Sequence, residues 1–185
     1  GNRMWDKTWT DYAHDAIEDQ RARTQQHASV TVTEAYQLQV VATDQEKREL
    51  AALLYSETTK GTFDEYAAIA SSVINRIYYG SPKELTPFPG SSSIYGVIHS
   101  GAYQGVMSNV PWSQAMDPNF HDAALDLAAK AVSYVLANGP TTNALFMGSQ
   151  PNLSYGVPTI PANPPQIGGT YFRTLTRSCG GPRCR

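Results

Sequence analysis

Two helix-start signals, separated by a very short connection, constrain what this chain can fold into. Thr43 and Thr62 are each followed three residues later by a glutamate, the spacing of a capping box, in which both side chains bond the exposed N–H groups of a helix's first turn. Gly61 stands where a glycine commonly ends a helix. The pattern predicts one helix from Thr43 to about Thr58 and a second over residues 63–79. So short a connection predicts that the two run antiparallel.

One carboxylate, Glu57, stands on the apolar face of the first predicted helix. It follows Leu50, Leu53 and Leu54 at the i, i+3, i+4, i+7 spacing of a single face. Burial on that face would raise its pKa, as a general acid working near neutral pH requires. The alternative is a helix-end glutamate that turns into solvent or pairs with Lys60.

The rest of the chain predicts a mainly helical (α+β) single domain with at most a small sheet. A short helix should follow Ser93, and Asp117–Pro118 has the pattern of another helix start. The segments ALFM and TYFRTL are the strand candidates of the second half. We expect an N-terminal arm over residues 1–43, one domain over 44–176 and an Arg-rich tail over 177–185.

The composition is that of a folded protein and excludes several partners. Apolar residues make up 41% and charged residues 16%, which is not typical of a disordered chain. The net charge of −2 gives no argument for nucleic acid or an anionic membrane. No apolar run is long enough to span a membrane, and no signal peptide is visible at the N-terminus. Cys179 and Cys184 are either a small-loop disulfide or free thiols.

Most kinds of catalytic site find no support in the sequence. The four histidines are scattered, so no metal site is predicted. There is no phosphate-binding glycine loop and no G-x-S-x-G motif, so we expect neither a cofactor nor a nucleophilic serine. Glycosidases normally use two carboxylates. The nearest acids to Glu57 are Asp64 and Glu65, whose positions the start of the second helix already explains.

Five short segments between about residues 46 and 173 carry a family resemblance. They are ELAALLYSETTKG, AAIASSVINRI, SIYGVIHSGAYQGV, NALFMGSQPN and IGGTYF. In order and spacing they resemble the SleB-type cell-wall hydrolase family, peptidoglycan-cleaving enzymes of bacteria and phages. The resemblance implies a lysozyme-like fold, close to goose-type lysozymes and lytic transglycosylases. It also implies that Glu57, in the position of the family's Y-x-E glutamate, is catalytic.

The chain departs from the family pattern at three places. Thr58–Gly61 replaces Ala-Arg-Gly-Glu after the catalytic glutamate, and Ala102–Val106 replaces Q-F-S-P-V, which puts Tyr103 at the phenylalanine. In IGGTYFR, Thr170 replaces a histidine and Arg173 a tyrosine. The glutamate and the framework therefore match better than the lining of the groove.

The resemblance implies cleavage between N-acetylmuramic acid and N-acetylglucosamine. With one carboxylate we expect a lytic transglycosylase: Glu57 protonates the bridging oxygen and then deprotonates the muramic acid C6 hydroxyl, which closes on C1 and leaves a 1,6-anhydro end. Oriented intramolecular attack is worth up to ~7–11 kcal/mol and needs no second carboxylate to activate water.

Two other functions stay open. A hydrolysing muramidase would release reducing ends, and a cell-wall-binding or virion structural module would have no activity. In each case the partner is peptidoglycan and the protein acts at the cell wall, whether secreted, periplasmic or carried by a phage particle. The N-terminal arm could dock it onto such an assembly.

Five residues are candidates for binding substrate. Tyr103 and Gln104 lie in a stretch that reads as irregular, where a ring can stack on a sugar and an amide can bind an acetamido group, although loop packing is as good an explanation. Ser71 and Asn75 lie on the second helix, and a structural hydrogen bond explains Asn75 equally well. Tyr171 is a candidate groove aromatic, with core packing as its alternative.

Overall fold

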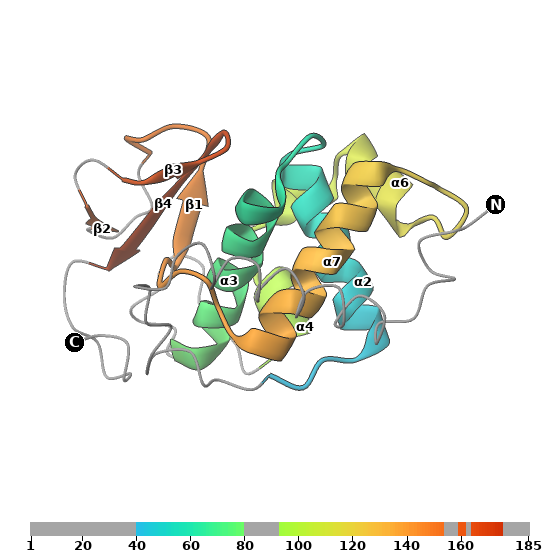
Figure 1. Cartoon of the computed structure of the whole chain (residues 1–185), viewed down its shortest axis with the longest axis horizontal. Coiled ribbons are helices and arrows are strands. Elements are labelled where there is room, and N and C mark those ends of the chain that lie inside the picture. Colours follow the sequence, from blue (N-terminus) through green and yellow to red (C-terminus); the bar gives the residue numbers. More distant parts are fainter. Residues whose placement is uncertain (1–39, 80–92, 154–158, 162–163, 176–185) are drawn as a thin grey trace, which may run out of the picture.

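The computed structural model describes residues 40–79, 93–153, 159–161 and 164–175, which form a mainly helical body with a small antiparallel sheet at one end (Figure 1). The helices are α2 (Asp44–Glu57), α3 (Phe63–Tyr79), α4 (Ile94–Ile98), α5 (Gln104–Met107), α6 (Val110–Met116) and α7 (Ala123–Asn138). The strands are β1 (Phe146–Gly148), β2 (Thr159–Ile160), β3 (Gln166–Ile167) and β4 (Thr170–Leu175). The predicted tail, both cysteines and the predicted arm up to residue 39 lie outside the described residues.

The first capping box forms as predicted and also joins two helices. The Thr43 hydroxyl accepts a hydrogen bond from the Glu46 N–H at 3.1 Å, and the Glu46 carboxylate accepts one from the Thr43 N–H at 3.0 Å. The second oxygen of Glu46 accepts a bond from the N–H of Tyr95 at 2.9 Å. Both oxygens of this buried carboxylate therefore have hydrogen-bond donors, and the side chain connects the start of α2 to α4.

The second capping box is only half formed. The Thr62 hydroxyl accepts a bond from the Glu65 N–H at 3.2 Å. The Glu65 carboxylate instead accepts bonds from the Gly169 N–H at 2.6 Å and the Thr170 hydroxyl at 3.1 Å. Explaining Glu65 by helix capping alone was therefore wrong: this side chain connects α3 to the turn between β3 and β4.

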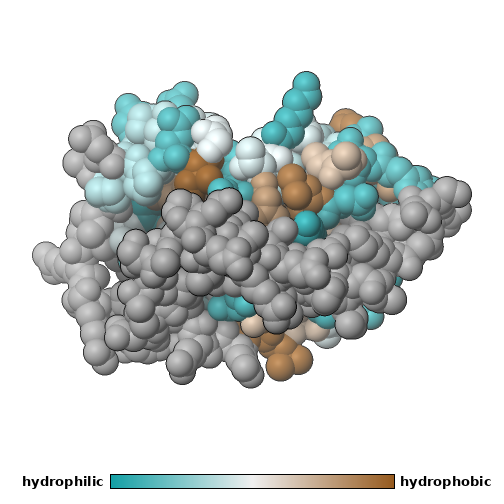
Figure 2. Space-filling model, viewed as in Figure 1, coloured by the Kyte–Doolittle hydropathy of each residue, from teal (hydrophilic) through white to brown (hydrophobic). Residues whose placement is uncertain are grey.

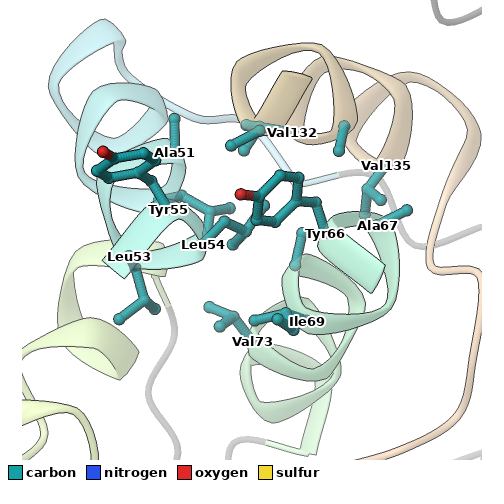
Figure 3. Close-up of a cluster of buried hydrophobic side chains, with 14 of the residues drawn as sticks. Ala51, Leu53, Leu54, Tyr55, Tyr66, Ala67, Ile69, Val73, Val132 and Val135 are labelled. Carbon is teal, nitrogen blue, oxygen red and sulfur yellow. The ribbon is translucent and has the colours of Figure 1, made fainter. Parts of the chain in front are cut away.

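The core lies where α2, α3 and α7 meet. Figure 1 shows the chain turning back between α2 and α3, as the short connection predicts, with α7 packed against both. Apolar side chains from all three helices meet in Figure 3, and the many buried alanines let the helices approach closely. The connection is closed by Tyr66, whose hydroxyl donates to the Thr58 carbonyl at 2.5 Å and accepts from the Gly61 N–H at 3.1 Å.

The start of α7 differs from the prediction. Asp117 ends α6 and forms a local turn, its carboxylate accepting a bond from the Asn119 N–H at 2.9 Å. The cap of α7 is Asp122, whose carboxylate accepts bonds from the next helical N–H groups at 2.8 and 3.3 Å. The stretch before Asp117, predicted to be irregular, contains α5 and α6.

The sheet is built around β4, which pairs antiparallel with β1, β2 and β3. The two predicted strand segments therefore pair with each other, as β1 and β4. Side chains of α3 hold the chain leading into β1: Asn75 donates to the carbonyls of Thr142 and Ala144, both at 2.8 Å, and Arg76 donates to that of Leu145 at 2.8 Å. On the face seen in Figure 2, the surface over the sheet is mostly hydrophilic. Within the described residues, no helix has the length and apolar character needed to cross a membrane.

Candidate functional site

Glu57 is the last residue of α2 and lies at the edge of the core. The three leucines that share its face have no exposed surface, and its own side chain is half-buried. Burial raises its pKa from 4.5 to about 7. Within the described part of the chain its carboxylate has no hydrogen bond or ion pair, and Lys60, the partner considered from the sequence, is exposed and does not pair with it.

The end of α2 is a poor place for a negative charge. A helix C-terminus carries the negative end of the helix dipole, and α2 has no basic residue in its last turn. Both burial and the dipole therefore favour the protonated form of Glu57. The backbone around it is fixed, because the Thr58 N–H bonds to Leu54 at 3.3 Å and the Thr58 carbonyl is held by Tyr66. A large share of the Glu57 carboxyl groups therefore keeps its proton up to about pH 7, whereas an ordinary glutamate is almost fully ionised there.

Tyr103 lies immediately before α5. Among the predicted site residues, it is the one whose pKa is affected by the charge of Glu57. Its side chain is 5% exposed, with the Arg76 guanidinium carbon 5.7 Å from the ring centre. Burial raises the pKa of Tyr103, the charge of Arg76 opposes that rise, and the charge of Glu57 adds to it. Because the ring is buried, it cannot offer a face to a sugar, so the predicted stacking role is wrong and packing explains the ring. Its neighbour Gln104 is exposed.

Ser71 and Asn75 lie in the interior, away from any substrate. Both have no exposed surface. Ser71 accepts a bond from the Thr141 N–H at 2.7 Å, and Asn75 bonds two carbonyls of the same segment. A substrate-binding role is therefore wrong for both, and the structural alternative accounts for them: they fasten the chain between α7 and β1 to α3. Tyr171 is half-buried in β4, paired with Gly148 and Gln166.

Arg76 is a buried charged residue beside Tyr103 that the sequence reasoning missed. It is 6% exposed and lies close to two rings, 5.7 Å from the centre of Tyr103 and 5.2 Å from that of Phe146. The sequence could have indicated this burial, because Arg76 follows Ile69 and Val73 at the spacing of one helical face, which is the buried face of α3. A charge on an apolar face is the same pattern that singled out Glu57.

Glu65 is the other charged residue that the sequence reasoning left out of the site. It is 2% exposed, in the first turn of α3. A Cβ added at Gly61, in the connection that follows Glu57, would lie 3.0 Å from one of its carboxylate oxygens. Glu65 is thus near the connection, but its hydrogen bonds are made to the sheet. Asp64 is exposed.

No family model, curated protein or solved structure matches this chain. The described residues also contain no group of three or more His, Cys, Asp or Glu placed to hold a metal ion. A hollow of about 300 Å³ between Val40–Ala42 and α7 includes none of the site residues. The functional group that stands out in the described residues is therefore the carboxyl group of Glu57.

Proposed function

We propose that this protein cleaves peptidoglycan glycan strands as a lytic transglycosylase, with a lysozyme-like helical domain and Glu57 as its acid and base. One observation carries the proposal. A carboxyl group without a partner among the described residues lies half-buried at the end of a helix, with its pKa raised to about 7. Perturbed carboxyl groups of this kind are typical of catalytic sites.

The reaction needs one group that first gives and then takes a proton. Protonated Glu57 transfers its proton to the oxygen between N-acetylmuramic acid and N-acetylglucosamine, and the bond from that oxygen to muramic acid C1 breaks. The C6 hydroxyl oxygen of the same muramic acid bonds to C1, and its proton passes to the Glu57 carboxylate. The products are a 1,6-anhydro end and a free C4 hydroxyl, and Glu57 is protonated again.

The surroundings of Glu57 favour attack by the sugar's own hydroxyl over attack by water. An inverting hydrolase needs a second carboxylate free to activate water, and a retaining one needs it as nucleophile. The Glu65 carboxylate already accepts hydrogen bonds from Gly169 and Thr170. Asp64 is exposed at the start of α3. A C6 hydroxyl needs neither acid, because its attachment to the substrate already orients it.

The partner in this proposal is peptidoglycan, and the place of action is the cell wall. Docking to a larger assembly, such as a phage particle, would fall to the N-terminal arm. The exposed Gln104 beside Tyr103 is the best placed of the candidate substrate-binding side chains, because its amide is free of side-chain hydrogen bonds within the described residues. Tyr171 is a second candidate.

Mass spectrometry of digested peptidoglycan tests the proposal. Purified sacculi are incubated with the wild-type protein, with Glu57→Gln, and with Asp44→Asn, a matched carboxylate-to-amide change at an exposed position of the same helix. We expect 1,6-anhydro muropeptides from the wild type and Asp44→Asn and none from Glu57→Gln. Reducing ends would instead identify a hydrolysing muramidase. Binding to sacculi without release of any product would identify a cell-wall-binding or structural module.

A further inference from the structure

Tyr95 places an exposed aromatic ring on α4, beside the start of α2 and so away from Glu57, which ends that helix. The residue is 54% exposed, although its neighbours Ile94, Val97 and Ile98 bury the other side of α4 in the core. A single exposed ring at a protein surface is ordinary and needs no explanation. This ring is different because the protein fixes it from two sides.

Two acids of α2 hold the ring in place. The backbone N–H of Tyr95 donates to the Glu46 carboxylate at 2.9 Å. The Tyr95 ring stacks on the ring of His99, with centres 4.1 Å apart and planes 31° from parallel. The Nε2 atom of His99 lies 3.1 Å from one oxygen of Glu49, which is 6% exposed, and the other oxygen accepts a bond from the Gln45 amide at 3.3 Å. The stacked pair is therefore preorganised.

The contact with Glu49 leaves an open acceptor beside the ring. An ionised carboxylate can only accept hydrogen bonds, so the Nε2 atom of His99 carries the hydrogen and donates it. In the neutral imidazole the Nδ1 atom is then an acceptor. His99 is exposed, and within the described residues its Nδ1 atom makes no hydrogen bond. An aromatic face and a hydrogen-bond acceptor thus lie side by side at the surface.

This pair of groups suits a sugar. The C–H groups of a sugar pack on an aromatic face, and its hydroxyl groups need acceptors. We propose that Tyr95 and His99 form a second binding site for the glycan strand, in which the Tyr95 ring stacks on a sugar and the Nδ1 atom of His99 accepts a bond from one of its hydroxyl groups. The carboxylates of Glu46 and Glu49 already accept bonds from the protein, so a cationic ligand is not favoured. The choice of glycan rests on the proposed function, but binding here does not need the chemistry of Glu57.

A second site along α2 would hold a long substrate near the catalytic carboxyl group. Glu49 precedes Glu57 by eight residues, which is about 12 Å along the helix axis. A strand bound at one place is present at a high effective concentration at the other. Because this binding is the same before and during the reaction, its loss should raise KM and leave kcat unchanged.

Isothermal titration calorimetry with soluble, peptide-free glycan strands tests this site. The parent protein carries Glu57→Gln, so that the strands stay intact, and Tyr95→Ala, Tyr95→Phe and Val110→Ala are made in it. Val110 is the matched control, an apolar residue of α6 that is 69% exposed. We expect Tyr95→Ala to weaken binding about three- to tenfold, and Tyr95→Phe and Val110→Ala to stay within about twofold of the parent. Affinity should be nearly the same at low and high salt.

The outcomes separate this site from the proposed function. The inference is overturned by a parent that binds no strands, by an unchanged affinity in Tyr95→Ala, by an equal loss in Tyr95→Phe or Val110→Ala, or by a steep dependence on salt. All of these leave the role of Glu57 to the mass spectrometry described above. A wild type that releases no product, together with weaker binding in Tyr95→Ala, overturns the proposed function and keeps this site.

A second measurement covers the case in which Tyr95→Ala does not fold. The backbone amide signals of the parent protein are followed by NMR while the same strands are added. Signals of Tyr95 and His99 should shift more than those of α6, and equal shifts overturn the inference.

Discussion

The carboxylate of Glu65 accepts a hydrogen bond from the backbone N–H of Gly169 at 2.6 Å, and so joins the first turn of α3 to the turn between β3 and β4. Gly168 lies directly beneath the same carboxylate, with φ at +61°. A Cβ added there would lie 2.3 Å from the Glu65 carboxylate oxygen. Only glycine allows both this backbone conformation and this close approach. The position of the sheet beside the connection that follows Glu57 therefore depends on a contact between one acid and two glycines.

Gly168→Ala should destabilise the protein strongly. The change adds strain at a positive φ and displaces the Glu65 carboxylate, so we expect a loss of roughly 2–4 kcal/mol in the free energy of unfolding. Urea denaturation measures it. Gly105→Ala is the matched control, because a Cβ at this helical position meets nothing within 4 Å, and it should be neutral or stabilise by up to about 1 kcal/mol. Equal effects of the two changes would show that the Glu65 contact does not hold the turn.

The pH dependence of activity should have its alkaline limb near pH 7. Glu57 must be protonated to donate to the bridging oxygen, and burial raises its pKa to about 7. Above that pH, kcat/KM should fall about tenfold per pH unit. Because burial and not a charged partner causes the rise, added salt should hardly move the limb. Release of muropeptides measured from pH 5 to 9, at low and high salt, checks both points. A kcat/KM that stays constant up to pH 9 would exclude Glu57 as the acid.

Glu57→Gln should make the protein more stable at alkaline pH. Between pH 4.5 and 7 the folded wild type keeps a proton on Glu57 that the unfolded chain has released. Its free energy of unfolding therefore falls as the pH rises through this range. The step from 4.5 to about 7 corresponds to at most roughly 3 kcal/mol, reduced by the partial exposure of the side chain. Denaturation curves of both proteins at pH 4 and pH 8 measure the difference, which should be absent at pH 4 and favour Glu57→Gln at pH 8.

The sequence predicts the parts of this molecule that depend on neighbouring residues. The bounds of α2 and α3 follow from capping signals and apolar spacing, and Glu57 stands out because an acid on an apolar face is unusual. The same reasoning would have found Arg76, which occupies the buried face of α3. β1 and β4 were visible as short apolar segments in a chain otherwise rich in proline and glycine.

The contacts that the sequence could not predict join distant residues. Glu65 bonds Gly169, 104 positions later, and no local pattern tells a capping carboxylate from one that reaches across the fold. Asp117 and Asp122 are both plausible helix caps by residue type. The protein uses the first for a turn and the second for α7, which only the packing of the whole chain decides. The burial of Tyr103 likewise involves Arg76, which lies in a different segment of the chain.

Asn75→Ala should lower the stability of the protein, whereas Gln104→Ala should raise KM and leave stability nearly unchanged. Asn75 is fully buried and donates to two backbone carbonyls at 2.8 Å. Its loss should cost roughly 2–4 kcal/mol of unfolding free energy, because both bonds vanish and the carbonyls stay buried. The KM of the remaining folded protein should be unchanged.

Gln104→Ala removes an exposed amide at the start of α5, so stability should change by less than about 0.5 kcal/mol. If the amide binds an acetamido group, KM should rise several-fold, since a hydrogen bond of this kind is worth about 1 kcal/mol. Urea denaturation and initial rates at several concentrations of soluble glycan strands separate the two effects. A raised KM for Asn75→Ala at unchanged stability would return that residue to the substrate groove, and an unchanged KM for Gln104→Ala would remove Gln104 from it.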